Sequence, residues 1–82
     1  MTLSHCTHRD HLIIAHLIEY PGIPTPWAGG CRITAPNGRQ SRRLPLPRAA
    51  AFLAELDSAK RASLAHGKWL VDQSLDQGKV LF

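Results

Sequence analysis

Hydrophobic residues follow two different patterns along this chain, and the change between the patterns separates a sheet-forming part from a helix-forming part. From residue 11 to residue 20 the sequence reads HLIIAHLIEY and then stops abruptly at Pro21-Gly22. A short helix capped by Thr7 would fit this length, but isoleucines followed by a turn signal favour a buried strand. We therefore expect the first strand over residues 11–20.

A second strand is predicted from Trp27 to Ala35, where apolar and polar residues alternate as in a half-buried strand. The Gly29-Gly30 pair within it indicates a bulge or a close backbone approach. The following Asn37-Gly38 is the preferred centre of a type I′ hairpin turn, because both residues tolerate positive φ. A third strand should then run from Arg39 to about Leu44 and end at the prolines that follow.

Residues 48–77 are rich in Ala and Leu and show the period of an amphipathic helix, for which Pro47 suits the first turn. Thirty helical residues would measure about 45 Å, more than the width of so small a domain. We therefore expect a bend near Gly67, or a projecting end that forms a homodimer. Phe52 and Trp69 are expected in the core. The predicted helical stripe contains Phe52, Leu56, Ala59, Ser63, His66 and Leu70.

These elements predict an α+β fold, in which a three-stranded antiparallel sheet (β-β-β) is followed by one long or two short C-terminal helices. The 82 residues suffice for one domain, and 44% hydrophobic with 20% charged residues is ordinary globular usage. Within this single domain, 1–82, we assign a loose N-terminal arm to residues 1–10, the sheet to 11–46, the helical part to 47–77 and a tail to 78–82. So small a domain has marginal stability, which leaves a homodimer open as a way to bury more surface.

Nothing in the sequence indicates export or a membrane anchor. The longest apolar run, Leu12–Ile18, is far shorter than the roughly 20 residues of a membrane span, and the first residues lack a basic region leading into an apolar stretch. Two cysteines, Cys6 and Cys31, cannot form a disulfide framework, so reduced thiols are favoured while a single bridge remains open. We expect a soluble cytoplasmic protein.

Five side chains that could bind a metal crowd into the N-terminal residues, but they lack a distant partner pair. Structural zinc sites combine two closely spaced ligands with a second such pair, and only Cys31 and His66 are available, each alone. The six carboxylates are scattered, and no spacing joins a nucleophile to a base and an orienting acid. The sequence thus predicts no metal, no cofactor and no enzyme activity. The N-terminal side chains in question are His5, Cys6, His8, His11 and His16.

Positive charge is concentrated beyond residue 30, and the net charge of +4 favours an anionic partner. Arginine guanidinium groups suit phosphate oxygens and guanine edges, so we predict a non-catalytic regulatory protein that contacts the nucleic-acid backbone. The alternative use of these arginines is to keep an edge strand soluble and to block edge-to-edge pairing. The predicted nucleic-acid-binding residues are Arg39, Arg42, Arg43 and Arg48, with Lys60 and Arg61 in support.

A protein-interaction module, acting as an inhibitor or adaptor, is the second hypothesis. The segment from Pro21 to Pro26 holds three prolines and one glycine, which restrict the backbone ahead of a tryptophan suited to anchor an interface. The tail ends in three apolar residues that either dock on the core or meet a partner. The predicted contact residues are Ile23, Trp27, Leu81 and Phe82. Accessory proteins of phages and mobile elements are similar in size and composition.

The order of three strands and a C-terminal helix, with Trp27 leading the second strand and Gly38-Arg39 at the hairpin, resembles sheet-reading DNA-binding domains such as the integrase arm-type and AP2-like modules. The resemblance covers about residues 27–67, and the proline-rich segments on both sides of the hairpin depart from it. It implies, by analogy of topology alone, a sheet that enters the major groove of DNA.

Overall fold

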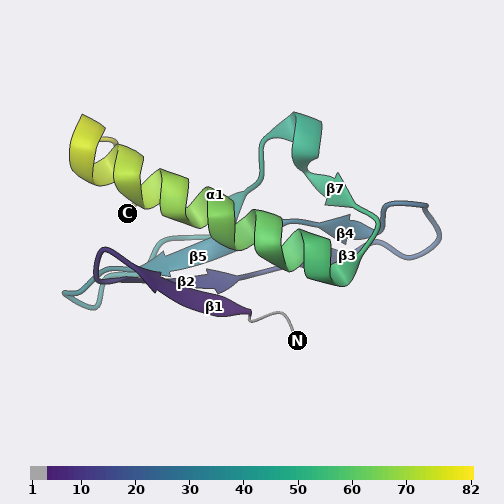
Figure 1. Ribbon diagram of the computed structural model, residues 1–82, viewed down its shortest axis with the longest axis horizontal. Helices are drawn as coiled ribbons and strands as arrows, with labels where there is room; N and C mark the ends of the chain where they lie inside the picture. Colours follow the sequence, from purple (N-terminus) through teal and green to yellow (C-terminus); the bar gives the residue numbers. More distant parts are fainter. Residues whose placement is uncertain (1–3) are drawn as a thin grey trace.

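The strands of this chain form two small antiparallel sheets, so the prediction of a single three-stranded sheet is wrong. The computed structural model describes residues 4–82 and has the strand orders β1-β2-β5-β6 and β3-β4-β7. The predicted α+β class with a C-terminal helix is confirmed (Figure 1). The elements are β1 (His5–His8), β2 (His11–Ala15), β3 (Ile18–Glu19), β4 (Trp27–Ala28), β5 (Gly30–Thr34), β6 (Leu44–Pro45), the 3-10 helix η1 (Arg48–Ala50), β7 (Phe52–Leu53) and α1 (Leu56–Gln77).

One long hairpin connects the two sheets. β2 pairs with β5 and β3 pairs with β4, and both pairs keep the same register. Between them, the His16 N–H donates to the Gly30 carbonyl at 2.9 Å, which continues the ladder. The reciprocal bond of this pair is not made, because the Gly30 N–H donates to Ser63 Oγ and the His16 carbonyl accepts from Arg43 Nε, both at 3.0 Å. The Gly29 N–H points to the other side and donates to the Ala51 carbonyl at 2.8 Å, which extends the β4–β7 pairing. The predicted strand over residues 11–20 is therefore confirmed, with one interruption.

The N-terminal residues are ordered into a strand, whereas we expected a loose arm over residues 1–10. β1 pairs with β2 along its whole length, although the first three residues of the chain lie outside the described part. The connecting residues are Arg9 and Asp10, with φ of 50° and 65°. Two central residues at positive φ define the tight hairpin turn that we had predicted at Asn37-Gly38. Arginine carries no sequence signal for this conformation, so the turn escaped prediction.

The chain also turns back at Asn37-Gly38, but through a three-residue loop. The Gly38 N–H donates to the Ala35 carbonyl at 2.9 Å, and the Ala35 N–H donates to the Arg39 carbonyl at 2.8 Å. Only Gly38 has positive φ, at 90°, as in a type I turn followed by a bulge residue. The predicted third strand, 39–44, is reduced to an isolated bridge at Gln40 and to β6.

The helix begins at Leu56 rather than near residue 48. The preceding residues form η1 and then β7, which pairs with β4 and so takes part in a sheet. α1 continues without a break through Gly67 and ends at Gly78, which has φ of 70°. The predicted bend near Gly67 is wrong, because this glycine serves a close contact with the sheet.

Small residues on α1 bring its backbone close to the sheet. Ala59, Ser63, Gly67 and Val71 are its buried positions, and a Cβ added at Gly67 would overlap Cγ2 of Ile13. Ser63 Oγ accepts a hydrogen bond from the Gly30 N–H at 3.0 Å and donates one to the Ala59 carbonyl at 2.7 Å. The largest fully buried side chains are Ile13, Ile33, Val71, Cys31 and Ser63.

The prediction that Phe52 and Trp69 belong to the core is wrong. Phe52 is 50% exposed in β7 and Trp69 is 53% exposed on α1, where it stacks on His66 with ring centroids 5.7 Å apart. A helix that approaches the sheet through alanine, serine and glycine leaves no room between the layers for large rings. Large side chains therefore lie elsewhere, and Phe52 lies on the sheet surface that α1 does not cover.

Candidate functional site

The face of the two sheets opposite α1 is not covered by another helix or strand of residues 4–82 (Figure 1). Successive residues of a strand point to opposite faces, so this uncovered surface follows from the pairing register. Ile14 pairs with Arg32, and Ile18 and Phe52 both pair with Ala28. We call this surface the open face. Its residues include Leu12, Ile14, His16, Ile18, Tyr20, Ala28, Gly30, Arg32, Thr34, Arg43 and Phe52, together with His5, Thr7, Gln40 and Pro45, which pair with members of this set.

The part of the open face on the second sheet is apolar. Ile18, Tyr20 and Phe52 are 37%, 47% and 50% exposed, and Ala28 lies buried between Ile18 and Phe52. The rings of Tyr20 and Phe52 meet edge to face, with centroids 5.8 Å apart and an angle of 62°. Exposed apolar groups gathered in this way are typical of a contact surface.

The neighbouring part of the open face carries two guanidinium groups. Arg32 is exposed, and its Nε donates to His16 Nδ1 at 3.3 Å. Arg43 lies above Gly30, where an added Cβ would come within 2.8 Å of its Cζ. A close approach was predicted at Gly29-Gly30, and the structure has one at each glycine, with the side chain of Leu46 packed on Gly29 and that of Arg43 on Gly30.

Arg43 is held by backbone carbonyls on two strands. Its Nε donates to the His16 carbonyl at 3.0 Å, and its Nη2 donates to the carbonyls of Ala28 and Gly29 at 3.1 and 3.0 Å. Within residues 4–82 its Nη1 makes no hydrogen bond, and no completely buried side-chain nitrogen in that range lacks a partner, so Nη1 is at least partly exposed. Arg43 therefore has a structural role and keeps one N–H edge free for a ligand.

None of the six carboxylates lies on the open face. Asp10 is in the turn between β1 and β2, and Glu19 lies on the opposite side of β3 from Ile18. The other four are at the start of α1 or within it, namely Glu55, Asp57, Asp72 and Asp76. The open face consequently combines cations and apolar side chains without an opposing negative charge, which favours an anionic ligand.

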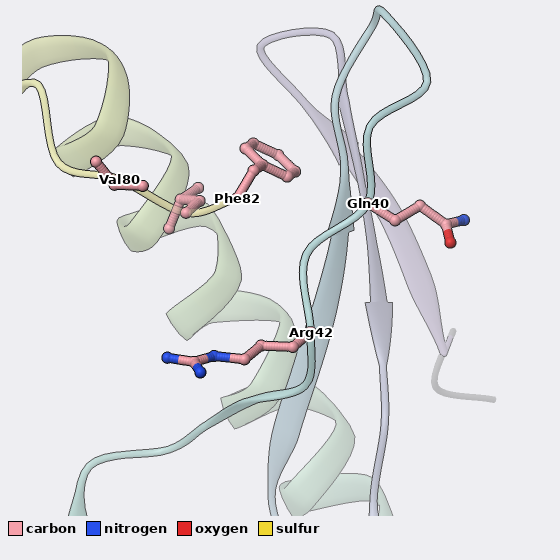
Figure 2. A pocket seen from close by; sticks show the side chains of 5 residues that line it. Gln40, Arg42, Val80 and Phe82 are labelled. Atoms are coloured by element: carbon pink, nitrogen blue, oxygen red, sulfur yellow. The ribbon is translucent and has the colours of Figure 1, made fainter.

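The predicted nucleic-acid-binding arginines do not form one surface. Arg39 lies beside the tail, with its Cζ 5.9 Å from the centre of the Phe82 ring, and Arg42 points toward the same tail (Figure 2). Arg48 is exposed in η1, and only Arg43 belongs to the open face. Lys60 and Arg61 lie on α1, in the other layer.

A shallow pocket of about 380 Å³ lies between the arginine-rich segment and the C-terminal tail. Figure 2 shows Arg42 on the tail side of the chain, while Gln40 points away from the tail. One guanidinium group and apolar walls could accept a small amphipathic anion, but the walls are made by the tail itself. The lining residues are Gln40, Arg42, Val80, Leu81 and Phe82.

The residues predicted for a protein interface are also dispersed. Ile23 is exposed in the loop at the end of the long hairpin, whereas Trp27 is half-buried in β4. Leu81 and Phe82 pack against the hydrophobic core, so the tail docks on its own chain. Of these four residues, Ile23 alone is freely available to a partner.

Histidines of the N-terminal cluster serve structural contacts instead of converging. His8 Nε2 lies 2.8 Å from Asp72 Oδ1, and Arg9 Nη1 donates to Asp72 and Asp76 at 3.1 Å. We call these four side chains the turn clasp. The hydrogen bonds from His8 and Arg9 lower the pKa of Asp72, while those carboxylates raise the pKa of Arg9. Within residues 4–82 no three His, Cys, Asp or Glu side chains come close enough to hold a metal ion.

Both cysteines are unbridged thiols. Cys31 is fully buried beneath α1, and burial raises its pKa to about 11. A thiol with so high a pKa is a poor nucleophile near neutral pH. No helix in the described part of the chain combines the length and the apolar character needed to cross a membrane.

Sequence reasoning missed most residues of the open face. The alternation in the second strand placed Arg32 on a different face from Cys31 and Ile33, and this signal would have identified it as a surface cation. Phe52 could not be found in this way, because its segment has the composition of a helix. Tyr20 was considered only as the last residue of a predicted strand and as one of five aromatic residues, a number that on sequence grounds disfavoured single-strand binding.

No known protein family matches the chain, and neither a curated protein nor a solved structure shows significant similarity to it. The resemblance to sheet-reading DNA-binding domains was based on three strands followed by a helix, and the two sheets of the structure do not have that topology.

Proposed function

We propose that this protein binds nucleic acid through the open face and has no catalytic role. One observation carries the proposal, namely that the uncovered sheet surface holds Arg32, Arg43 and exposed apolar side chains but no carboxylate. Phosphate groups neutralise such cations on binding and release counterions, which makes binding favourable at moderate salt. The net charge of +4 adds a long-range attraction for the same class of ligand.

The proposal changes the predicted set of contacts. Arg43 remains in the site, and Arg32 joins it as the most exposed cation of the open face. Arg39 and Arg42 face the tail, so they could reach only a ligand that extends around the sheet edge. Lys60 and Arg61 belong to the helix layer and serve as comparison sites.

The test is a titration of labelled oligonucleotides by the purified protein at several salt concentrations. The logarithm of the binding constant falls linearly with the logarithm of the salt concentration, and each phosphate contact contributes about 0.7 to 0.9 to the steepness of that line. Arg32→Gln should therefore weaken binding and reduce the slope by about that amount. Arg61→Gln removes the same charge from α1 and should leave the slope nearly unchanged.

Two results would contradict the proposal. Absence of binding at low salt would exclude nucleic acid as the ligand, and equal effects of the two substitutions would mean that net charge alone drives binding. Circular dichroism of each variant checks that the fold is kept. Both residues are exposed, so neither substitution should disturb the core.

A protein partner, including a second copy of this chain, is the second candidate function. Its support is the exposure of Ile23 at the tip of the long hairpin together with Ile18 and Phe52 on the open face. An apolar interface depends weakly on salt. Sedimentation at several protein concentrations would reveal a homodimer, and Phe52→Glu should dissociate it if the open face is the interface.

A further inference from the structure

We propose that the ligand of the open face is single-stranded nucleic acid, whose unpaired bases stack on the rings of Tyr20 and Phe52. This inference rests on the proposed function and narrows its ligand class. It comes from a juxtaposition within one sheet surface, where two exposed rings lie at one end of the hairpin and the guanidinium groups follow along the same hairpin.

The two rings are available to an outside ligand. Tyr20 and Phe52 contact each other edge to face, and about half of each side chain is exposed. Every base has a flat π-surface, so an exposed ring can accept it whatever the sequence. In a duplex the flat surfaces are occupied by neighbouring bases, so the ring pair would gain nothing from double-stranded nucleic acid.

The number of cations also favours a single strand. The open face offers the Arg32 guanidinium and the free Nη1 edge of Arg43, and the remaining hydrogen-bonding atoms of Arg43 bind backbone carbonyls. Affinity for a duplex comes mainly from many neutralised phosphates. Two arginines are too few for that mode, whereas stacking can supply the remaining affinity on a single strand.

The arrangement defines a path for the strand. From Leu12 to Tyr20 the extended hairpin segment measures about 26 Å at the usual rise of a β-strand. The rings of Tyr20 and Phe52 lie at one end of this segment, and Arg32 and Arg43 lie beside its middle. Bases would stack at the ring end while phosphates contact the guanidinium groups, with the apolar pair of Ile18 and Ala28 between them.

The experiment compares one 12-nucleotide labelled strand, the same strand hybridised to its complement, and a strand of equal length with abasic sites in place of bases. The protein should bind the normal single strand more tightly than the duplex or the abasic strand. Stacking is worth about 1–3 kcal/mol per base, so Tyr20→Leu and Phe52→Leu should each weaken binding of the single strand about 5- to 160-fold. Leucine retains apolar surface and removes the ring.

Trp69→Leu provides the matched control, because it removes an equally exposed ring from α1. It should leave binding of the single strand unchanged. If the duplex or the abasic strand binds as tightly as the normal single strand, or if Tyr20→Leu and Phe52→Leu bind like the wild type, the inference is overturned. The proposed function would survive these outcomes provided that binding remains sensitive to salt and to Arg32→Gln, whereas no binding of any oligonucleotide would overturn both.

Discussion

The two faces of the long hairpin have opposite environments although the same strands build them. Ile13 is completely buried against α1, while its neighbour Ile14 is 40% exposed on the open face. The covered face is closed by small residues of the helix, and the open face keeps isoleucines and aromatic rings in contact with water. An apolar strand residue is therefore not necessarily a core residue, and apolar exposure on one side of a sheet points to a ligand or partner.

The largest difference between the faces should appear when the two isoleucines are shortened. Ile13→Ala removes buried methyl groups and leaves a cavity, so the free energy of unfolding should fall by about 2–5 kcal/mol. Ile14→Ala changes a surface position and should alter it by about 0.5 kcal/mol or less. Urea denaturation measures both values. Equal losses would show that the open face is buried in solution, as in a dimer.

A smaller effect is expected where the helix binds the hairpin through a hydrogen bond. Ser63→Ala leaves the buried Gly30 N–H without its acceptor, and an unsatisfied buried donor costs about 1–3 kcal/mol. Ser58→Ala, near the start of α1, gives a control with the same chemical change outside the core. Urea denaturation measures the free energy of unfolding of both variants. Equal losses would contradict the role assigned to the Ser63 hydrogen bond.

The smallest effect should come from the turn clasp, at the rim between the faces. Its hydrogen bonds lower the pKa of Asp72 in the folded protein, so they stabilise the fold above the ordinary pKa of about 4 and are lost as the pH falls through the lowered value. Asp72→Asn should slightly reduce the melting temperature at pH 7. The difference from wild type should shrink below about pH 4, and a difference independent of pH would refute this assignment.

Local pattern was enough to predict several features of the fold. Isoleucine-rich residues 11–20 and the prolines after them indicated a strand, and Asn37-Gly38 marked a reversal of the chain. The reversal uses a three-residue loop because Pro36 fits the turn ahead of Gly38, which alone takes positive φ. Pattern thus located the turn without specifying its type.

Features that depend on distant contacts could not be predicted. Phe52 has helical neighbours in sequence, yet β7 forms because β4 offers it a pairing partner. Trp69 lies outside because Gly67 contacts Ile13 and fixes the rotation of α1. Arg9 accepts positive φ in a turn whose side chains bind Asp72, 63 residues away. The open face depends on all of these long-range contacts, so its residues could be identified only from the structure.

The helix α1 follows all the strands in the chain, so it is synthesised after the hairpin that it covers. The long hairpin is complete at Thr34, but the helix that shields its core face ends only at Gln77. At about 5–20 residues per second, a ribosome needs roughly 2 to 9 s to make the intervening chain. During that interval the nascent hairpin has apolar residues on both sides, so it is the stage at which chaperones would matter most.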